Sequence, residues 1–392
     1  NILRGQFGEK VYEVDARGKL LKEISQINPI DGDSIFTSID LGSHIAADKA
    51  LQDRMGAVVA VEIETGAIVT LFSSPSYSIN DLSNGITSEK FSSLINNPNK
   101  PFFNRALRGS YPPASTIKPA LGIFGIQNEL INWNYSIQDP GFFTLPEDGR
   151  IYRGWKKGGH GEVNLEKAIV VSSNTFFFSL AYRADIDELG DHLKKLGFGK
   201  KVCLDCFDEY AGYVPTPQWK RNNFNSGWSR GDTVNLGVGQ GYMESTPIQL
   251  AYYSSILANK GSVKELSIVK SSKKKSTKVI ELNNFNKNDW SQLHNAMTNV
   301  IDSSSGTSRR LKDLKSFQVA AKSGTAELVS LDSKEDYLLI RKNKTQRDHA
   351  IMIAFGPMPN PKYAVSVVIE NGESGGAVAG PVAIAVLKEL IE

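Results

Sequence analysis

The stretch YPPASTIKPALGIFGIQNEL, residues 111–130, combines a predicted helix start with a candidate nucleophile. Its first two prolines fix an extended approach, and Pro119 is tolerated in a helix only within the first turn. A helix is therefore predicted to begin near Ser115, which places Lys118 on the same helix face three residues later. Ser115 is then either a helix N-cap or a hydroxyl with an amine within reach.

A serine that acts as a nucleophile without histidine needs another base, because a free hydroxyl is a weak nucleophile. A partly buried Lys118 is a candidate base if desolvation or a second cation lowers its pKa. The dipole of the helix N-terminus also favours negative charge that develops near Ser115. An S-x-x-K pattern alone is common in long chains, so the local sequence favours the cap.

A second polar group occurs in VVSSNTFFF, residues 170–178. The three phenylalanines predict a segment anchored in the core, with Ser172 and Asn174 directed to one side. Such a pair can relay a proton and hydrogen-bond an amide. The same triplet also fits an ordinary helix N-cap.

A third group lies in FQVAAKSGTAEL, residues 317–328, which predicts a short strand. On a strand Lys322 and Gly324 face one side, whereas Ser323 and Thr325 face the other. The glycine allows a ligand to approach the backbone closely, and a free strand edge can pair with an extended peptide. The lysine would supply the second cation that lowers the pKa of the lysine in the first group.

The two ends of the chain predict one antiparallel sheet. Residues 56–77 form two β-rich runs around Gly66, and residues 349–372 repeat the pattern around a proline-rich turn. The final segment, 375–392, is predicted to be a helix that covers the sheet. Residues 1–40 predict a small strand pair or the tail of a truncated domain.

The charge balance does not indicate a nucleic-acid or acidic partner, because the formal net charge is +3 over 392 residues. The one basic run, residues 269–280, is interpreted as a solvated hairpin tip or loop rather than a lipid or nucleic-acid contact. No run of 18 apolar residues occurs. The chain begins at Asn1, so a missing anchor or signal segment says little about the native protein.

The cysteine content excludes a four-cysteine zinc site. Cys203 and Cys206 are the only cysteines, in a single C-x-x-C. A local disulfide and two free thiols both remain open, with a structural role favoured because the flanking sequence lacks a thioredoxin-like context.

Together the three groups follow the order S-x-x-K, S-x-N and K-[ST]-G-[ST], the set found in penicillin-binding proteins and class A β-lactamases. Because all three motifs occur in this order, the helix N-cap is no longer the favoured interpretation of Ser115. Longer stretches resemble the transpeptidase domain of the elongation-type class B penicillin-binding proteins. They are GSYPPASTIKP, DPGFF, WKKGGHG, SSNTFFF, GDTVNLGVGQGYMESTPIQLA and AAKSGTAE.

The resemblance implies a fold, two domains and a location. The expected fold is α/β of the α+β kind: a five-stranded antiparallel sheet flanked by helices, plus a mostly helical subdomain, as in penicillin-binding proteins and serine β-lactamases. Residues 41–392 would be the transpeptidase domain, and residues 1–40 the remnant of a membrane-proximal pedestal. The location would be the periplasmic face of the bacterial inner membrane, with a single N-terminal transmembrane anchor that this chain lacks.

The resemblance also implies site residues. Its catalytic group comprises Ser115, Lys118, Ser172, Asn174 and Lys322, and its substrate-binding strand comprises Ser323, Gly324 and Thr325. In these roles Ser115 is acylated and Lys118 is its general base. Ser172 and Asn174 assist proton transfer and bind the substrate amide. The backbone N–H groups of Ser115 and Thr325 form the oxyanion hole.

The implied activity is D,D-transpeptidation, which cross-links peptidoglycan stem peptides for cell elongation and rod shape, with a possible D,D-carboxypeptidase side activity. Expected partners are stem peptides ending in D-Ala-D-Ala, covalently inhibiting β-lactams, and elongation-complex membrane proteins including a glycosyltransferase, without nucleic acid. A serine β-lactamase and a non-catalytic β-lactam-binding sensor or scaffold are the alternatives.

The sequence departs from the family pattern in three places. Ser323 replaces a threonine found in many relatives, and the second motif has asparagine where some relatives have aspartate; both changes keep hydrogen-bonding groups. Some relatives hold zinc with two aspartates, a histidine and a cysteine. Asp139 and His160 match that set, but Gly154 and Ser173 do not, so neither a metal nor a cofactor is expected.

Overall fold

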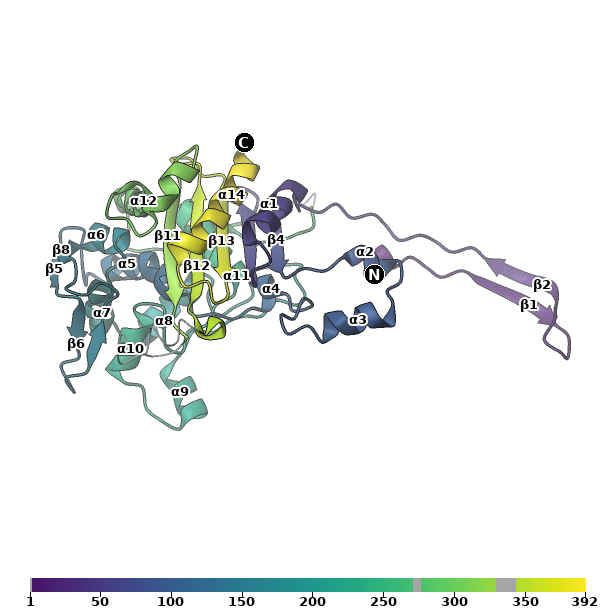
Figure 1. Ribbon diagram of the computed structural model, residues 1–392, viewed down its shortest axis with the longest axis horizontal. Coiled ribbons are helices and arrows are strands. Elements are labelled where there is room, and N and C mark those ends of the chain that lie inside the picture. Colours follow the sequence, from purple (N-terminus) through teal and green to yellow (C-terminus); the bar gives the residue numbers. More distant parts are fainter. Residues whose placement is uncertain (1, 271–275, 329–342) are drawn as a thin grey trace.

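The computed structural model describes residues 2–270, 276–328 and 343–392, and its centre is a five-stranded antiparallel sheet (Figure 1). The strand order is β11-β12-β13-β3-β4. The bounds are β3 Gly56–Glu62, β4 Ala67–Ser74, β11 Ala320–Ala326, β12 His349–Gly356 and β13 Tyr363–Ile369. The predicted sheet and its flanking helices are confirmed.

The two predicted hairpins meet in the middle of the sheet. Gly66 has a φ of 69°, which suits the tight turn between β3 and β4. Strand β13 of the C-terminal hairpin pairs with β3, from Tyr363 opposite Glu62 to Ile369 opposite Gly56. The ends of the chain therefore share one sheet, as expected.

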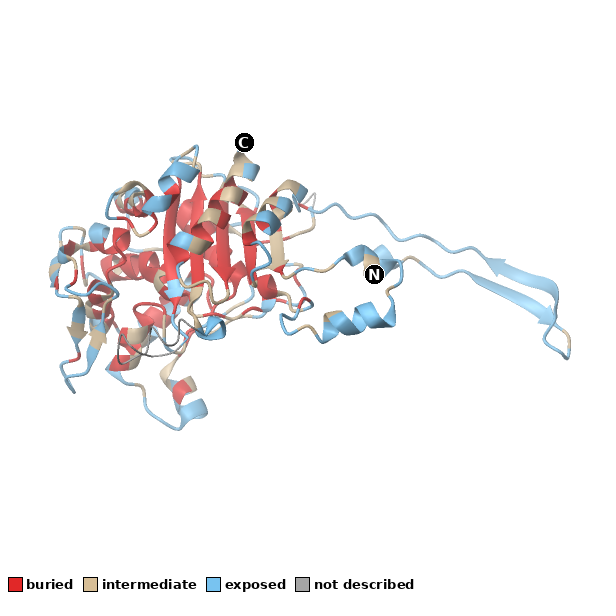
Figure 2. Ribbon diagram, viewed as in Figure 1, coloured by how far each residue is buried: buried red, intermediate tan, exposed pale blue. Residues whose placement is uncertain are grey.

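Helices cover both faces of the sheet, which explains why β3 is apolar along almost its whole length (Figure 2). Val58 and Ala60 pack in a core with α1 (Leu41–Leu51) and α14 (Gly380–Ile391). Val59 and Val61 face the other core, which includes α11 (Pro247–Ala258). Alternate side chains of one strand thus enter two cores.

The mostly helical part lies beyond the β11 edge of the sheet (Figure 1). Its helices are α5 Lys118–Gln127, α6 Leu165–Val170, α7 Asn174–Arg183, α8 Ile186–Lys195, α9 Pro217–Phe224 and α10 Arg230–Leu236. Two small antiparallel pairs accompany them: β5 Ser136–Asp139 with β8 Gly161–Asn164, and β6 Phe142–Thr144 with β7 Ile151–Arg153. This part supplies the first two motifs.

The remaining elements connect the sheet to its surroundings. The helices are α2 Ile79–Ser83, α3 Ser88–Ile95, α4 Arg105–Arg108 and α12 Lys287–Asp302. The short 3₁₀ and π turns are η1 Ile2–Arg4, η2 Ala114–Ile117, η3 Arg309–Leu314, η4 Lys344–Gln346 and η5 Gly375–Ala379. Strand β10 (Thr277–Val279) pairs with β9 (Ser262–Lys264). The centre of the basic run, residues 271–275, lies outside the described residues.

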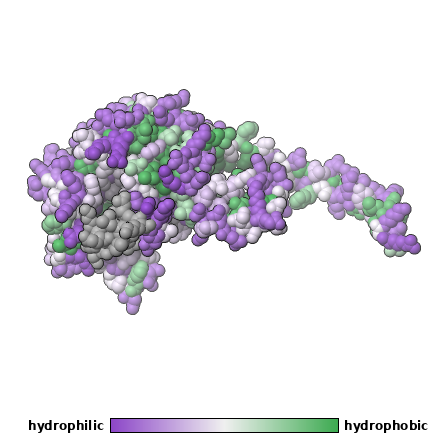
Figure 3. All heavy atoms as spheres, viewed as in Figure 1, coloured by the Kyte–Doolittle hydropathy of each residue, from purple (hydrophilic) through white to green (hydrophobic). Residues whose placement is uncertain are grey.

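The N-terminal residues form an extended arm (Figure 1). Strands β1 (Glu9–Val14) and β2 (Leu20–Ile27) pair antiparallel around a turn at Gly18, which confirms the predicted strand pair. Every residue of both strands is exposed. Exposed hydrophobic side chains lie among hydrophilic ones along this arm (Figure 3). They include Val11, Val14, Leu20, Leu21, Ile24 and Ile27.

The structure answers the question of the two cysteines. Cys203 and Cys206 form a disulfide, so the alternative of two free thiols is excluded. Among the described residues, no helix has the length and apolar character needed to cross a bilayer.

Removing residues 1–34 is expected to leave the melting temperature of the body within about 2 °C of the full chain, because the arm strands are exposed and bury nothing against the sheet. The truncation keeps Ser38, whose buried hydroxyl donates to the Ile68 carbonyl. Differential scanning calorimetry of both chains measures the effect. A much larger fall in melting temperature would show that the arm belongs to the folded body.

Candidate active site

The turn that carries Ser115 is not capped by its hydroxyl. Ser115 lies in η2, and α5 begins at Lys118 with Pro119 in its first turn. Neither element has a side-chain cap, and within the described part of the chain the half-buried Ser115 hydroxyl forms no hydrogen bond. The preceding Ala114 has a φ of 50°, a conformation that costs energy for a residue with a side chain. The N-cap interpretation of Ser115 is therefore wrong.

Two segments distant in sequence hold this turn in place. The Ala114 N–H donates to the Gly239 carbonyl at 2.8 Å. Tyr111 and Ser245 exchange backbone hydrogen bonds of 2.9 and 2.8 Å. The Tyr111 hydroxyl donates to Glu370 Oε1 at 2.8 Å, at the end of β13. The approach to Ser115 is thus fixed from both sides, by the 239–245 loop and by the sheet.

The buried Arg105 reinforces this support. Its Nε donates to the same Glu370 oxygen at 2.9 Å, and its other nitrogens donate to the backbone carbonyls of Asn99 and Lys100. The cation is 3% exposed, so its partners offset the cost of burial.

In the second motif the two predicted roles, helix N-cap and polar group of the site, belong to two adjacent residues. Ser173 is the N-cap of α7, because its hydroxyl oxygen accepts from the Phe176 N–H at 3.2 Å. Ser172 has a φ of 56°, and this turn leaves its side chain free for the site. The three phenylalanines behind it are buried, as predicted.

The three motifs meet at the Ser172 hydroxyl. Lys118 Nζ donates to Asn174 Oδ1 at 2.7 Å, to the Ser172 carbonyl at 2.9 Å and to Ser172 Oγ at 3.1 Å. Lys322 Nζ donates to the same Ser172 Oγ at 2.9 Å and to the Ser323 carbonyl at 3.0 Å. Both lysines are fully buried. The structure therefore brings Lys118, Ser172, Asn174 and Lys322 into one cluster.

Burial lowers the pKa of both amines. For Lys118 desolvation is the main cause, and the positive charge of Lys322 adds to it, while Asp139 opposes the shift; the resulting pKa lies well below its usual range. Desolvation lowers the pKa of Lys322 to about 7. The lowered pKa of Lys118 favours its neutral amine, the form that a general base requires.

The third motif lies on β11, at the edge of the sheet within the described residues. The Ser323 hydroxyl is hydrogen-bonded to the Thr307 hydroxyl at 2.9 Å. Thr325 is exposed, and its carbonyl accepts from Gln240 Nε2 at 3.2 Å. Thr307 and Gln240 were not predicted, because they reach the motif only through tertiary contacts.

Gly324 is explained by the turn that carries Ser115. A Cβ on Gly324 would lie 3.0 Å from Thr116 Cγ2, 3.2 Å from the Pro113 carbonyl oxygen and 3.3 Å from Ala114 Cβ. The sequence suggested that this glycine admits a ligand. In the structure the turn that carries Ser115 occupies that space, so the glycine sets the distance between the first and third motifs.

The residues present do not fit the zinc site of some relatives. Asp139 Oδ2 accepts from the Ser173 hydroxyl at 2.7 Å, and its Oδ1 accepts from the Gly141 N–H at 2.8 Å. The ring of His160 packs against Trp155, with centroids 5.3 Å apart. No thiolate is available, Gly154 offers no side chain, and hydrogen bonds already use both oxygens of Asp139.

One other cluster of metal-binding residue types occurs among the described residues: Cys203, Asp205 and Cys206. Its two sulfurs form the disulfide. The Asp205 carboxylate accepts from the backbone N–H groups of Ile268 and Val269. This cluster is therefore structural.

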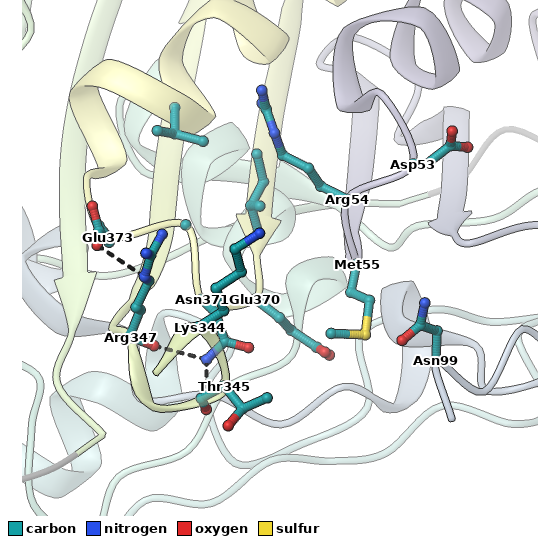
Figure 4. Close-up of a pocket in the computed structure, with 13 residues that line it drawn as sticks. Asp53, Arg54, Met55, Asn99, Lys344, Thr345, Arg347, Glu370, Asn371 and Glu373 are labelled. Atoms are coloured by element: carbon teal, nitrogen blue, oxygen red, sulfur yellow. Dashed lines mark hydrogen bonds and ion pairs between the residues drawn. The ribbon is translucent and has the colours of Figure 1, made fainter. Parts of the chain in front are cut away.

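A pocket of about 640 Å³ lies apart from the three motifs, and none of their residues lines it (Figure 4). It is bordered by Arg54, by Arg347 with its partner Glu373 at 3.2 Å, and by Glu370. Glu370 connects it to Tyr111, so the pocket adjoins the support of the Ser115 turn rather than the reacting groups.

Comparison with known proteins identifies the family. The Penicillin binding protein transpeptidase domain matches residues 56–388. The chain therefore belongs to the penicillin-binding protein transpeptidase family, in the class B branch of elongation-type penicillin-binding proteins 2.

Three relatives illustrate the similarity. The peptidoglycan D,D-transpeptidase MrdA of Acinetobacter baumannii is 36% identical over 386 residues, which are 97% of this chain and 57% of that protein. The crystal structure of Pseudomonas aeruginosa PBP2 in complex with WCK 5153 has 36% identity and a TM-score of 0.82, covering 93% of this chain and 77% of that one. PBP2 of Helicobacter pylori in complex with MreC has 29% identity and a TM-score of 0.84, covering 100% and 70%. The chain spans about three fifths of the length of the curated relatives it matches.

Purified protein is expected to retain far less than one zinc per chain after incubation with zinc and desalting, because two of the four ligand positions hold Gly154 and Ser173. The double variant Gly154→Asp, Ser173→Cys restores two aspartates, a histidine and a cysteine, and is expected to bind one zinc. Elemental analysis by mass spectrometry measures both. One zinc retained per wild-type chain would contradict the prediction.

Proposed function

We propose that this chain is a serine D,D-transpeptidase that cross-links peptidoglycan stem peptides through an acyl-enzyme on Ser115, for cell elongation and rod shape. The observation that carries the proposal is the convergence of two buried lysines on the Ser172 hydroxyl, beside the turn that presents Ser115. The family membership and the MrdA relatives support the same reaction.

In the first half-reaction the Ser115 oxygen attacks the carbonyl of the penultimate D-Ala. Neutral Lys118 takes the hydroxyl proton. For this step the amine rotates so that its lone pair points to Ser115 instead of to the second motif. The ester bond to Ser115 forms and the D-Ala–D-Ala amide bond breaks. The leaving amine is protonated through Ser172, whose hydroxyl both lysines contact.

In the second half-reaction the amine of a neighbouring stem peptide attacks the ester. A new amide bond forms as the ester bond breaks, the attacking amine gives up a proton to neutral Lys118, and the lysine passes that proton to the Ser115 oxygen. Water in place of that amine gives a D,D-carboxypeptidase side reaction. A β-lactam imitates the D-Ala-D-Ala terminus and leaves a long-lived ester on Ser115.

The oxyanion hole in this proposal consists of the backbone N–H groups of Ser115 and Thr325. The Thr325 carbonyl bonds Gln240, which lies off the β11 edge. In an antiparallel strand the N–H and C=O of one residue point to the same side, so the Thr325 N–H also points away from β12. Lys322, Ser323 and Thr325 would then hold the substrate carboxylate and backbone.

A serine β-lactamase is less compatible with the geometry. Rapid hydrolysis requires a carboxylate or comparable base aimed at water. The carboxylate that acts electrostatically on Lys118 is Asp139, and hydrogen bonds from Ser173 and Gly141 hold it in place. A scaffold, or a sensor that binds β-lactams without being acylated, would not require a neutral lysine base.

The location and partners are part of the proposal. The Cys203–Cys206 disulfide suits an oxidising compartment such as the periplasm. We assign residues 1–40 to the end of a membrane-proximal pedestal, supported by the exposed apolar side chains of the arm, on a protein anchored in the inner membrane. Stem peptides, β-lactams and elongation-complex proteins, including a glycosyltransferase, are the proposed partners. The complex of the Helicobacter pylori relative with MreC supports a protein partner.

Incubation with a fluorescent penicillin is expected to label the wild type to one adduct per chain, whereas Ser115→Ala shows no labelling, because the acyl bond requires the Ser115 oxygen. Peptide mass spectrometry maps the adduct, and circular dichroism confirms that the variant is folded. Ser110→Ala, five residues earlier, is the matched control and retains labelling. Equal labelling of Ser115→Ala, or fast turnover of a chromogenic cephalosporin, would contradict the proposal.

The rate constant of penicillin acylation is expected to rise with pH and reach its plateau well below pH 10.5, the usual lysine value, because only neutral Lys118 accepts the proton. Lys322→Met removes the neighbouring cation, so the pKa of Lys118 rises. The acid limb of the pH profile of the acylation rate constant then moves to higher pH. Stopped-flow acylation over a pH series that starts at about pH 5, the lower end of the range in which most proteins are most stable, measures this acid limb. An unmoved limb would exclude electrostatic coupling between the two lysines.

A further inference from the structure

The Gln240 side chain occupies a backbone acceptor at the open edge of β11. Its Nε2 donates to the Thr325 carbonyl at 3.2 Å, in an exposed position. Strand β11 pairs with β12 on its other side, with Thr325 opposite Ala350. Among the described residues β11 is the last strand of the sheet, so Gln240 bonds to the side where a further strand would add.

A peptide that adds to this edge needs the same acceptor. Strand addition works through backbone hydrogen bonds from the incoming N–H groups to the carbonyls of the edge strand. The terminal amide of glutamine is the same kind of donor as a peptide N–H. Gln240 therefore donates to the Thr325 carbonyl as a substrate amide would. The Gln240 amide and a substrate N–H cannot occupy the same hydrogen-bonding position at this oxygen at once.

The backbone beneath Gln240 is fixed while its side chain can rotate. Gly239 and Gly241 flank it with φ values of 71° and 81°. A Cβ on Gly239 would lie 2.1 Å from the Ala114 carbonyl oxygen, and the Gly239 carbonyl accepts from the Ala114 N–H. The loop is thus tied to the residue before Ser115. Departure of the Gln240 side chain needs only torsions about its own bonds.

We propose that Gln240 is a specificity-determining residue that closes the substrate edge of β11 in the free enzyme and is displaced by acyl donors carrying an amide N–H for the Thr325 carbonyl. The proposal rests on the function proposed above. An acyl donor with this N–H replaces the hydrogen bond from Gln240 with its own. An acyl donor without it forms no hydrogen bond to the Thr325 carbonyl.

The test compares two β-lactams on wild type and Gln240→Met, which keeps the side-chain length and removes the donor. One is a penicillin with an acylamino side chain; the other is a carbapenem with a hydroxyethyl group in its place. For the penicillin we expect the Kd of the initial complex to fall about two- to tenfold, the worth of one exposed hydrogen bond, with the acylation rate constant unchanged. For the carbapenem both constants stay within about twofold.

Gln218→Met is the matched control, since Gln218 is exposed on α9 and bonds Asn222 instead. It is expected to change neither constant. A penicillin Kd that is unchanged or raised in Gln240→Met would overturn the proposal. Equal loss of acylation with both drugs would also overturn it, because Gln240 would then only support the strand. Failure of the wild type to react with either drug would instead refute the proposed function.

Discussion

The burial of two lysine ammonium groups against one serine hydroxyl is the constraint on which the site depends. Removing a cation from water is costly, and both Lys118 and Lys322 are fully buried. Hydrogen bonds to Ser172, to Asn174 and to backbone carbonyls offset part of that cost. The remainder lowers the affinity of both amines for protons, which is what a base for a serine nucleophile needs.

This pair can form only if the helical part and the sheet are held at a fixed distance. Lys118 and Ser172 come from the helical side, whereas Lys322 comes from the edge strand β11. Gly324 lets the Ser115 turn lie directly on that strand, and the bond from Ala114 to Gly239 holds the turn from the other side. The positive φ values at Ala114 and Ser172 are strain that these contacts maintain.

Hydrogen bonds of Ser173 and Asp139 orient the turn of the second motif. Ser173 caps α7 and also donates to Asp139, whose carboxylate is buried close to Lys118. The Ser173 hydroxyl therefore links the Ser172–Asn174 turn to a buried carboxylate and fixes the orientation of that turn. The cap interpretation of this triplet was correct for Ser173 and incomplete for its two neighbours.

The sequence by itself determined the local elements and the candidate site residue types, because turn glycines, prolines and apolar patterns act over short ranges. The Gly66 hairpin and the strand of Lys322 formed as predicted, whereas the helix predicted to begin near Ser115 begins at Lys118, after a 3₁₀ turn. Only the tertiary structure decided which of these groups touch. In the tertiary structure Ser115 does not cap a helix, and the turn that carries it packs against Gly324. Contacts with distant parts of the chain place Asp139, Thr307 and Gln240 beside the motifs. Contacts between residues so far apart in the chain depend on how the sheet packs against the helices, and no local pattern records that packing.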